Sequence, residues 1–358
     1  YLVFYGESQV RWTWNETWQM FRHTINRYSD TTYYFINVGT NPGKRISKVA
    51  APSSPADEIV TTYNHYDYYE KEEVNFLKSG MIWLGEVFDT KLNYDFKFDL
   101  TDVVESEPAR IELSVAARSA AKSTFTSSIN GFHFKSEIGV VNLNRYESTL
   151  AQFGKSFVSF TPRNGIANLS LSYDKPLSTS RGWLNFITIG CRKQLNDRQE
   201  QLFFRDVNSI DPTNVVEFRI NSSNGALRVW ELTDKFNIQE LTVTDNASTK
   251  SILTSTSVLK EFVAFRELND RDVYAVGEIQ NQNLHAQAVA DLAIVTHPNF
   301  IQQAEELANF HRSEGLEVNV ATTEQIYNEF SSGAQDLVAI RSYLKMFYDR
   351  STAEKEIK

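Results

Sequence analysis

One cysteine and six histidines are the side chains of this sequence most suited to nucleophilic or acid–base catalysis. The cysteine is Cys191, and the histidines are His23, His65, His133, His285, His297 and His311. No two histidines are two or four positions apart, so the paired spacing of a zinc-protease helix is missing. A single cysteine also excludes an intrachain disulfide and a cysteine-based zinc site. We predict no metal ion and no cofactor.

Cys191 and His297 are the two candidate catalytic residues, and each has a structural alternative. A thiol nucleophile needs a positioned base and an oxyanion site, and the sequence around Cys191 offers neither. We therefore interpret Cys191 as a buried structural thiol. His297 follows a short apolar run, at the position where sites of α/β proteins usually form. The alternative, which the pattern favours, is a loop residue beside Pro298 at the start of a helix.

Other ligand-binding motifs are weak or missing. The joint after the apolar run reads Thr-His-Pro-Asn and lacks the glycines of a phosphate-binding loop, so we expect no dinucleotide site. A tryptophan cluster is compatible with a sugar-stacking platform or, as the pattern favours, with packing between strands; it comprises Trp12, Trp14 and Trp18. Four short glycosylation sequons do not by themselves predict a modification; they begin at Asn15, Asn168, Asn221 and Asn246.

The composition is that of an ordinary folded protein. Of 358 residues, 41% are hydrophobic and 23% are charged, which indicates two to three globular domains. The net charge of −9 argues against general nucleic-acid binding, which requires a basic surface. No run of 18 apolar residues predicts a transmembrane helix. The chain begins at Tyr1 without a leader pattern, so we expect a processed chain or a fragment.

Apolar and polar side chains alternate with period two over roughly the first 280 residues, which predicts β-strands. One face of each strand is apolar and the other polar, as in a sheet packed on one side against a core. Strands at spacings of about ten residues indicate a β-sandwich. We predict an N-terminal β-rich region over 1–68 and a β-sandwich domain over 69–280. The clearest runs are 94–98, 111–117, 169–173 and 216–220.

Turn residues predict two hairpins and one long connection. Asn224-Gly225 separates the runs 216–220 and 227–232 and predicts the stronger hairpin, because both residues accept positive φ angles. Asn130-Gly131 predicts a weaker one. Residues 50–57 are small, polar and rich in proline, which favours a linker or a long loop.

A different pattern begins after about residue 287 and predicts an α/β domain. Residues 292–295 form a short apolar run typical of a strand buried on both faces, and a second strand is expected over 316–320. The intervening helix has Asn299 as its N-cap and Gly315 just after its end. Strand, helix and strand with short joints predict a parallel βαβ unit. The apolar stripe of the helix comprises Phe300, Ala304, Leu307, Ala308 and His311.

Two further helices are predicted, over 324–330 and from the N-cap Asp336 to about residue 350. The second helix needs a following strand to pack against, and the sequence ends at Lys358 before one. We therefore expect 288–358 to be the first part of a truncated α/β domain. The apolar stripe of the second helix comprises Leu337, Ile340, Leu344, Phe347 and Tyr348.

The segment 279–350 resembles the gingipain-type (C25-type) cysteine peptidases, and within them the sortases of the type IX secretion system. Residues 326–333, Ile-Tyr-Asn-Glu-Phe-Ser-Ser-Gly, are the most specific part of the resemblance. The other parts are 279–285, 291–296, and Asp336 with 339–341, and looser similarity lies at 33–35, Ser79-Gly80, 83–86, Val229-Trp230 and Thr233-Asp234.

The resemblance implies a fold and an activity. The fold is multidomain, with a β-sandwich-rich N-terminal region followed by the start of a caspase-like α/β peptidase domain. The activity is that of a cysteine peptidase whose thiolate attacks a backbone carbonyl with a histidine as base. The resemblance implies that both dyad residues lie C-terminal to Lys358; Cys191 precedes the α/β domain, and His297 is not in the family's histidine motif. In a sortase, an amine of a surface glycolipid then resolves the thioester.

The resemblance also implies a substrate and partners. Such sortases remove the C-terminal signal domain of secreted cargo and attach the cargo to anionic lipopolysaccharide at the cell surface. The implied partners are a PorV-like outer-membrane β-barrel and PorQ- and PorZ-like subunits, on the extracellular face of the outer membrane. Two alternatives stay open: a non-enzymatic cell-surface binding module, and a secreted gingipain-like protease that uses water as acceptor.

Overall fold

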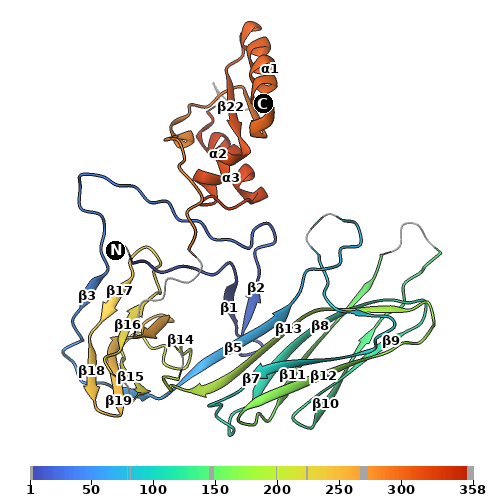
Figure 1. Ribbon diagram of the computed structural model, residues 1–358, viewed down its shortest axis with the longest axis vertical. Coiled ribbons are helices and arrows are strands. Elements are labelled where there is room, and N and C mark those ends of the chain that lie inside the picture. The colour runs from blue at the N-terminus through green and yellow to red at the C-terminus, as the bar shows by residue number, and fades with distance from the viewer. Residues whose placement is uncertain are drawn as a thin grey trace. The chain divides into compact units, whose positions relative to one another are not determined.

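The computed structural model divides into two compact units (Figure 1). The β unit comprises residues 12–23 and 44–269, and the α/β unit comprises residues 1–11, 24–43 and 270–358. This order confirms the predicted fold class, while the predicted boundaries at residues 68, 280 and 288 stay predictions. The structure describes residues 3–78, 80, 82–144, 149–198, 200–222, 225–266 and 273–352.

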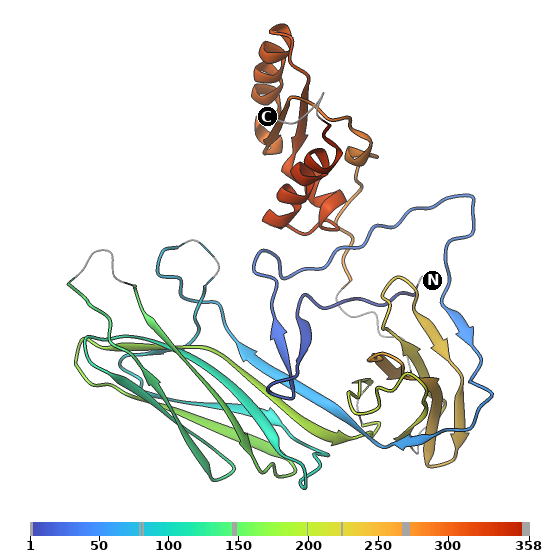
Figure 2. The same cartoon turned by 180° about the vertical axis from the view of Figure 1, so that it is seen from behind.

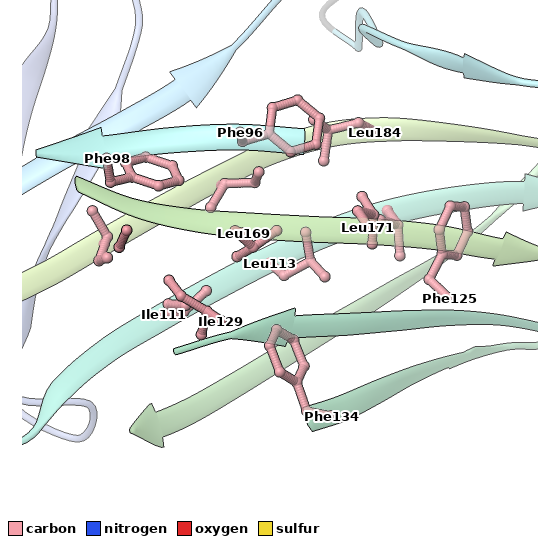
Figure 3. Packing of buried hydrophobic residues seen from close by; sticks show 14 of the residues in the cluster. Phe96, Phe98, Ile111, Leu113, Phe125, Ile129, Phe134, Leu169, Leu171 and Leu184 are labelled. Atoms are coloured by element: carbon pink, nitrogen blue, oxygen red, sulfur yellow. The ribbon is translucent and has the colours of Figure 1, made fainter. Parts of the chain in front are cut away.

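Two sheets form the first sandwich of the β unit. One sheet has the order β10 (Phe132–Ile138), β9 (Ser123–Ile129), β12 (Ile166–Asp174) and β7 (Asn93–Asp99). The other has the order β11 (Gln152–Phe160), β8 (Ala109–Arg118), β13 (Arg181–Gln194) and β5 (Thr62–Glu70), with the short β6 (Val87–Phe88) paired to β13. Figure 3 shows side chains from both sheets, among them Phe96, Leu113 and Phe125, meeting in one core.

The alternating pattern of β8 explains this core only in part. Ile111 and Leu113 are fully buried against the opposite sheet, as the alternation predicts. Glu112 and Ser114, on the other face, are also buried, so the predicted polar, solvated face is wrong for this strand. The reason is a tertiary contact: β1 (Arg11–Asn15) and β2 (Met20–Thr24) form a hairpin, and Arg22 of that hairpin donates to Glu112.

Of the two predicted hairpins, one is confirmed and one is wrong. Asn130 and Gly131 have φ angles of 49° and 82° and connect the antiparallel strands β9 and β10. The runs that flank Asn224-Gly225 become β15 (Val215–Asn221) and β16 (Arg228–Glu231), which lie in different sheets. Asn224 itself lies outside the described residues.

A second sandwich completes the β unit, and its buried cluster is separate from the first. Its sheets have the orders β14 (Gln201–Phe204), β20 (Phe262–Phe265), β16, β17 (Gln239–Leu241), β3 (Ser47–Val49), and β18 (Val243–Asn246), β19 (Thr249–Ser255), β15, β4 (Glu58–Val60). Residues 50–57 connect β3 to β4 and so pass from one sheet to the other, which confirms the long-loop alternative. Figure 2 shows β13 beside β5, its antiparallel partner in the first sandwich.

The α/β unit contains the predicted parallel βαβ element. β21 (Leu292–Thr296) pairs in parallel with β22 (Val318–Thr322), and α1 (Ile301–Ser313) connects them. Two short 3-10 turns lie before and after β21, η1 (Leu284–Ala286) and η2 (Pro298–Phe300), while α2 (Thr323–Phe330) and α3 (Leu337–Arg350) follow β22. Gly315 has the predicted positive φ, 93°, and Asp336 caps α3 as predicted. In the described part of the chain, no helix has the length and apolar character to cross a membrane.

The helix faces differ from the predicted stripes. α1 begins after η2, so Asn299 is not its N-cap, and it buries Ala304 and Ala308, while Leu307 is 50% exposed. α3 buries Ala339, Tyr343 and Phe347 and leaves Tyr348 74% exposed. The described sheet has two strands, so β21 is half-buried along its length, contrary to the predicted full burial. A narrow sheet covers only part of each apolar helix surface.

Candidate functional site

The carboxyl edge of the parallel sheet is where an α/β fold usually places its site. Thr296 and Thr322 are aligned at this edge, and His297 follows Thr296. The exposed His297 ring caps η2, since its Nδ1 accepts from the backbone N–H of Asn299 at 3.2 Å. Thr322 caps α2 in a reciprocal capping box with Gln325. Both side chains therefore cap the N-terminal ends of helical segments, which supports the interpretation of His297 as a loop residue at the start of a helix.

A carboxylate clasp connects the end of α2 to the segment before β21 and is formed by Gln282, Leu284, His285 and Glu329. Glu329 Oε1 accepts from the Leu284 N–H at 2.6 Å and from Gln282 Nε2 at 2.9 Å. Glu329 Oε2 accepts from the His285 N–H at 3.1 Å and lies 2.6 Å from His285 Nδ1. The most specific family-like segment, 326–333, thus contacts another such segment, 279–285, through one side chain.

The electrostatics of the clasp favour the ionised form of Glu329. Burial alone would raise the pKa of this carboxyl, but the donors of Leu284, Gln282 and His285 outweigh it and hold the pKa below its usual range. The His285 ring stacks on Phe330 with centroids 4.4 Å apart, and its side chain is 52% exposed. The sequence's one cysteine, Cys191, lies in the β unit, so this imidazole–carboxylate pair has no thiol beside it in the α/β unit.

Residues of α3 also hydrogen-bond to the segment that contains His285. Arg350 Nη1 donates to the carbonyl of His285 at 2.8 Å, and the Tyr343 hydroxyl donates to Gln287 Oε1 at 2.8 Å. Tyr343 is fully buried, and burial together with the charge of Glu329 raises its pKa to about 12. The clasp therefore positions the chain that enters β21, and its contacts are those of a structural support.

An N-terminal segment of the α/β unit contacts the turn after α2. Gly333 in this turn has a φ of 85°, and a Cβ placed there would lie 3.1 Å from Tyr33 Cβ and 3.4 Å from Phe35 Cζ. Tyr34 accepts from the Glu7 N–H at 2.5 Å and packs on Phe4. The looser family-like motif 33–35 therefore meets the most specific one, a contact that sequence spacing alone did not predict.

In the β unit, the structure places a histidine opposite Cys191, which the sequence interpretation missed. Cys191 on β13 and His65 on β5 are directly opposed in register. Burial raises the pKa of the Cys191 thiol to about 12 and lowers the pKa of His65 to about 3. At neutral pH the pair is therefore thiol and neutral imidazole, which is the unreactive form of a cysteine–histidine pair. Cys191 is part of the sandwich core, as predicted.

A second arrangement resembles a hydrolytic triad but is closed to solvent. His23 Nδ1 lies 2.8 Å from Thr188 Oγ1, and its Nε2 lies 2.6 Å from Glu70 Oε2. Thr188 is fully buried, and the His23 side chain is 2% exposed. A nucleophile must reach its substrate, so we assign these contacts to docking of the β1–β2 hairpin on the sheet.

The tryptophan cluster also packs the β1–β2 hairpin against the sheet. Trp12 packs against Tyr66 with ring centroids 4.2 Å apart, and Trp14 packs against Phe21 at 5.1 Å. Trp18 stacks on Phe157 at 4.0 Å and is 40% exposed. Strand packing, the favoured alternative, therefore accounts for Trp12 and Trp14.

The remaining candidates do not assemble into a site. His133 lies on β10, and His311 lies in the last turn of α1 beside Glu314. Throughout the described ranges, no three His, Cys, Asp or Glu side chains gather as a metal site. The sequon asparagines lie at Asn15 in β1, Asn168 in β12, Asn221 in β15 and Asn246 in β18, and their modification stays untested.

Comparisons with known proteins show which family and which solved structures this chain is similar to. Residues 285–358 match Peptidase family C25. The crystal structure of dimeric latent PorU from Porphyromonas gingivalis matches with a TM-score of 0.77 and 22% sequence identity, over 97% of this chain and 34% of that chain. A carbohydrate-binding module CBM36 in complex with calcium and xylotriose matches with a TM-score of only 0.20, at 11% identity, over 27% of this chain and 71% of that one. No curated protein matches the sequence.

The chain spans about a third of the PorU structure that it matches. The family match begins at His285, inside the clasp, and includes β21, α1, β22, α2 and α3. The chain is therefore PorU-like in fold and carries the start of a peptidase family C25 domain at residues 285–358.

Proposed function

We propose that this chain is the N-terminal part of a type IX secretion sortase. Such an enzyme is a cysteine endopeptidase and transpeptidase that removes the C-terminal signal domain of secreted cargo and attaches the cargo to anionic lipopolysaccharide. One observation carries the proposal: the C25 match lies at the end of a chain that shares the PorU fold over 97% of its length.

The proposal gives the two units different tasks. The α/β unit supplies the first parallel layer of the peptidase domain, and its edge strands accept further strands from residues that follow Lys358. As the family resemblance implies, the catalytic histidine and cysteine belong to those residues; within this chain, Cys191 is an unreactive core thiol and His297 caps a 3-10 turn. The β unit serves in docking and substrate presentation, for which a rigid sandwich pair is suited.

The proposal also includes a location and partners. The protein acts on the extracellular face of the outer membrane, held by a PorV-like β-barrel and accompanied by PorQ- and PorZ-like subunits.

The activity is tested with the full-length protein and a cargo that carries a C-terminal signal domain. We expect intact-mass spectrometry to find cargo joined to an amine-bearing glycolipid. Cleaved cargo without the glycolipid would support the secreted gingipain-like protease instead. Uncleaved cargo with the signal domain still attached would support the non-enzymatic binding module. Peptide mapping of the same sample checks that a cysteine and a histidine follow Lys358.

A further inference from the structure

Two neighbouring cavities lie beneath the tip of the β1–β2 hairpin in the β unit. Their volumes are about 180 and 170 Å³, and both are lined by Gln19, Met20 and Arg110. The larger cavity continues to Trp14, Glu107, Arg192 and Asn208. A cavity of about 150 Å³ holds one six-membered ring, so the larger one matches a ligand the size of a monosaccharide or an amino acid.

Arg110 is a half-buried cation that the described structure leaves unpaired. It lies on β8, opposite Gly190 on β13 and Ser159 on β11, neither of which offers a carboxylate. The nearest acid on the same face of β8, Glu112, uses both of its oxygens to accept from Arg22. Within the described ranges, the side chain of Arg110 has no hydrogen bond and no ion pair, although a partly buried charge ordinarily has a partner.

Arg192 brings a second positive charge to the lining of the same cavity. This residue is 8% exposed, and its Nη atoms donate to Asn64 and Thr62 and pair with Asp206. Its Nε is buried without a hydrogen-bond partner among the described residues, and it forms a long ion pair with Glu107 Oε2 at 4.0 Å. The guanidinium of Arg192 therefore adds positive charge to the lining, and the structure gives its Nε no access to the cavity.

We propose that this cavity binds a small organic carboxylate. The carboxylate accepts hydrogen bonds from the guanidinium of Arg110, a geometry that guanidinium groups favour, and the charge of Arg192 in the lining attracts it. Trp14 and Met20 give the apolar wall on which the body of the ligand packs. Glu107 adds a negative charge to the lining, which selects a singly charged carboxylate over a phosphate dianion. This binding does not depend on the proposed peptidase activity.

Two sources provide such a carboxylate: an acidic sugar, and the C-terminal end of a peptide. Isothermal titration calorimetry of the chain with D-glucuronate and with N-acetyl-leucine separates them. The neutral analogues glucose and N-acetyl-leucinamide, and inorganic phosphate, are the ligand controls. We expect one of the acids to bind with a dissociation constant of roughly 0.1–1 mM and the controls to bind much more weakly.

The variant Arg110→Gln tests the assignment, and Arg163→Gln is its matched control. Arg163 lies in an exposed turn, away from both cavities, so its substitution removes the same charge elsewhere. We expect Arg110→Gln to weaken carboxylate binding about tenfold or more and Arg163→Gln to leave it unchanged. The carboxylate affinity of Arg110→Lys should fall between those of the two glutamine variants, because lysine keeps the positive charge but lacks the paired N–H donors of a guanidinium.

Any of three binding results would overturn the proposal: no heat of binding from either acid up to about 10 mM, equal binding of acid and neutral analogue, or full binding by Arg110→Gln. Since Arg110 has no described partner, Arg110→Gln should fold, and its melting temperature should equal that of Arg163→Gln. A melting temperature well below that of Arg163→Gln would identify Arg110 as a structural residue and contradict the assignment.

Discussion

Glu329 Oε2 lies 2.6 Å from the Nδ1 of His285, and the two residues are 44 positions apart in the chain. This contact joins the C-terminal turn of α2 to the segment that precedes β21. In a parallel βαβ unit the first strand has no preceding element to fix it, so the clasp determines where the chain enters the sheet. The clasp therefore holds the segment that leads into β21 against α2.

Replacing Glu329 by glutamine should weaken the clasp. The new amide group would bring two donors to a site where Gln282 and His285 already donate. We expect a loss of about 1–3 kcal/mol in the stability of the α/β unit. Hydrogen exchange of the Leu284 and His285 amides measures it directly, since both donate to this carboxylate. Glu306→Gln, an exposed change on α1, is the control; equal exchange rates in the two variants would contradict the role assigned to Glu329.

The same carboxylate predicts a pH dependence. The pKa of Glu329 is lowered in the folded state, so its contribution to stability is complete above the ordinary glutamate pKa of about 4.3. That contribution is lost as the pH falls through the lowered pKa of the folded state. The stability difference between the wild type and Glu329→Gln should therefore be constant from pH 7 to about 5 and shrink below about pH 4. Urea unfolding followed at several pH values measures it; a difference that grows on acidification would refute the assignment.

Gly333 and Gly315 form a matched pair for testing the contact of residues 33–35 with the turn after α2. Both have positive φ angles, 85° and 93°, but only Gly333 has neighbours near the position of an added Cβ. Alanine at Gly315 should cost about 1–2 kcal/mol from backbone strain alone. Alanine at Gly333 should cost more, because Tyr33 must also move. Limited proteolysis of residues 24–43 should accelerate in Gly333→Ala only; equal cleavage of both variants would show that the contact does not hold this segment.

How far the sequence predicted this structure depends on the range of the interactions involved. Asn130-Gly131, Gly315 and Asp336 were predicted correctly, because each is determined by the backbone preferences of a few neighbouring residues. The pairing around Asn224-Gly225 was wrong, because alternation fits either strand partner and long-range packing selects one. Burial of Glu112 on the supposedly solvated face followed from a hairpin about 90 positions away.

The site was less predictable than the fold. His297 was recognised as a residue that follows a strand, and the structure adds its capping contact with Asn299. The clasp at Glu329 gave no spacing signal, because its partners come from a distant segment without a regular pattern. The one available signal was the family resemblance itself, since both segments belong to its strongest parts. Neither Arg110 nor His65 could be identified before the sheet register placed their neighbours.

Cys191 should be dispensable for the proposed peptidase activity. Its thiol is buried in the sandwich core, and burial raises its pKa to about 12, so almost no thiolate exists at neutral pH. We expect Ellman's reagent to modify Cys191 rapidly in urea and very slowly in the native chain. Cys191→Ala should cost about 1 kcal/mol, comparable to the loss of a buried methyl group, and leave cargo processing by the full-length protein intact. If a Cys191→Ala protein lost processing but melted near the wild-type temperature, the result would contradict this prediction. It would indicate that Cys191 acts in catalysis together with His65, its cross-strand neighbour.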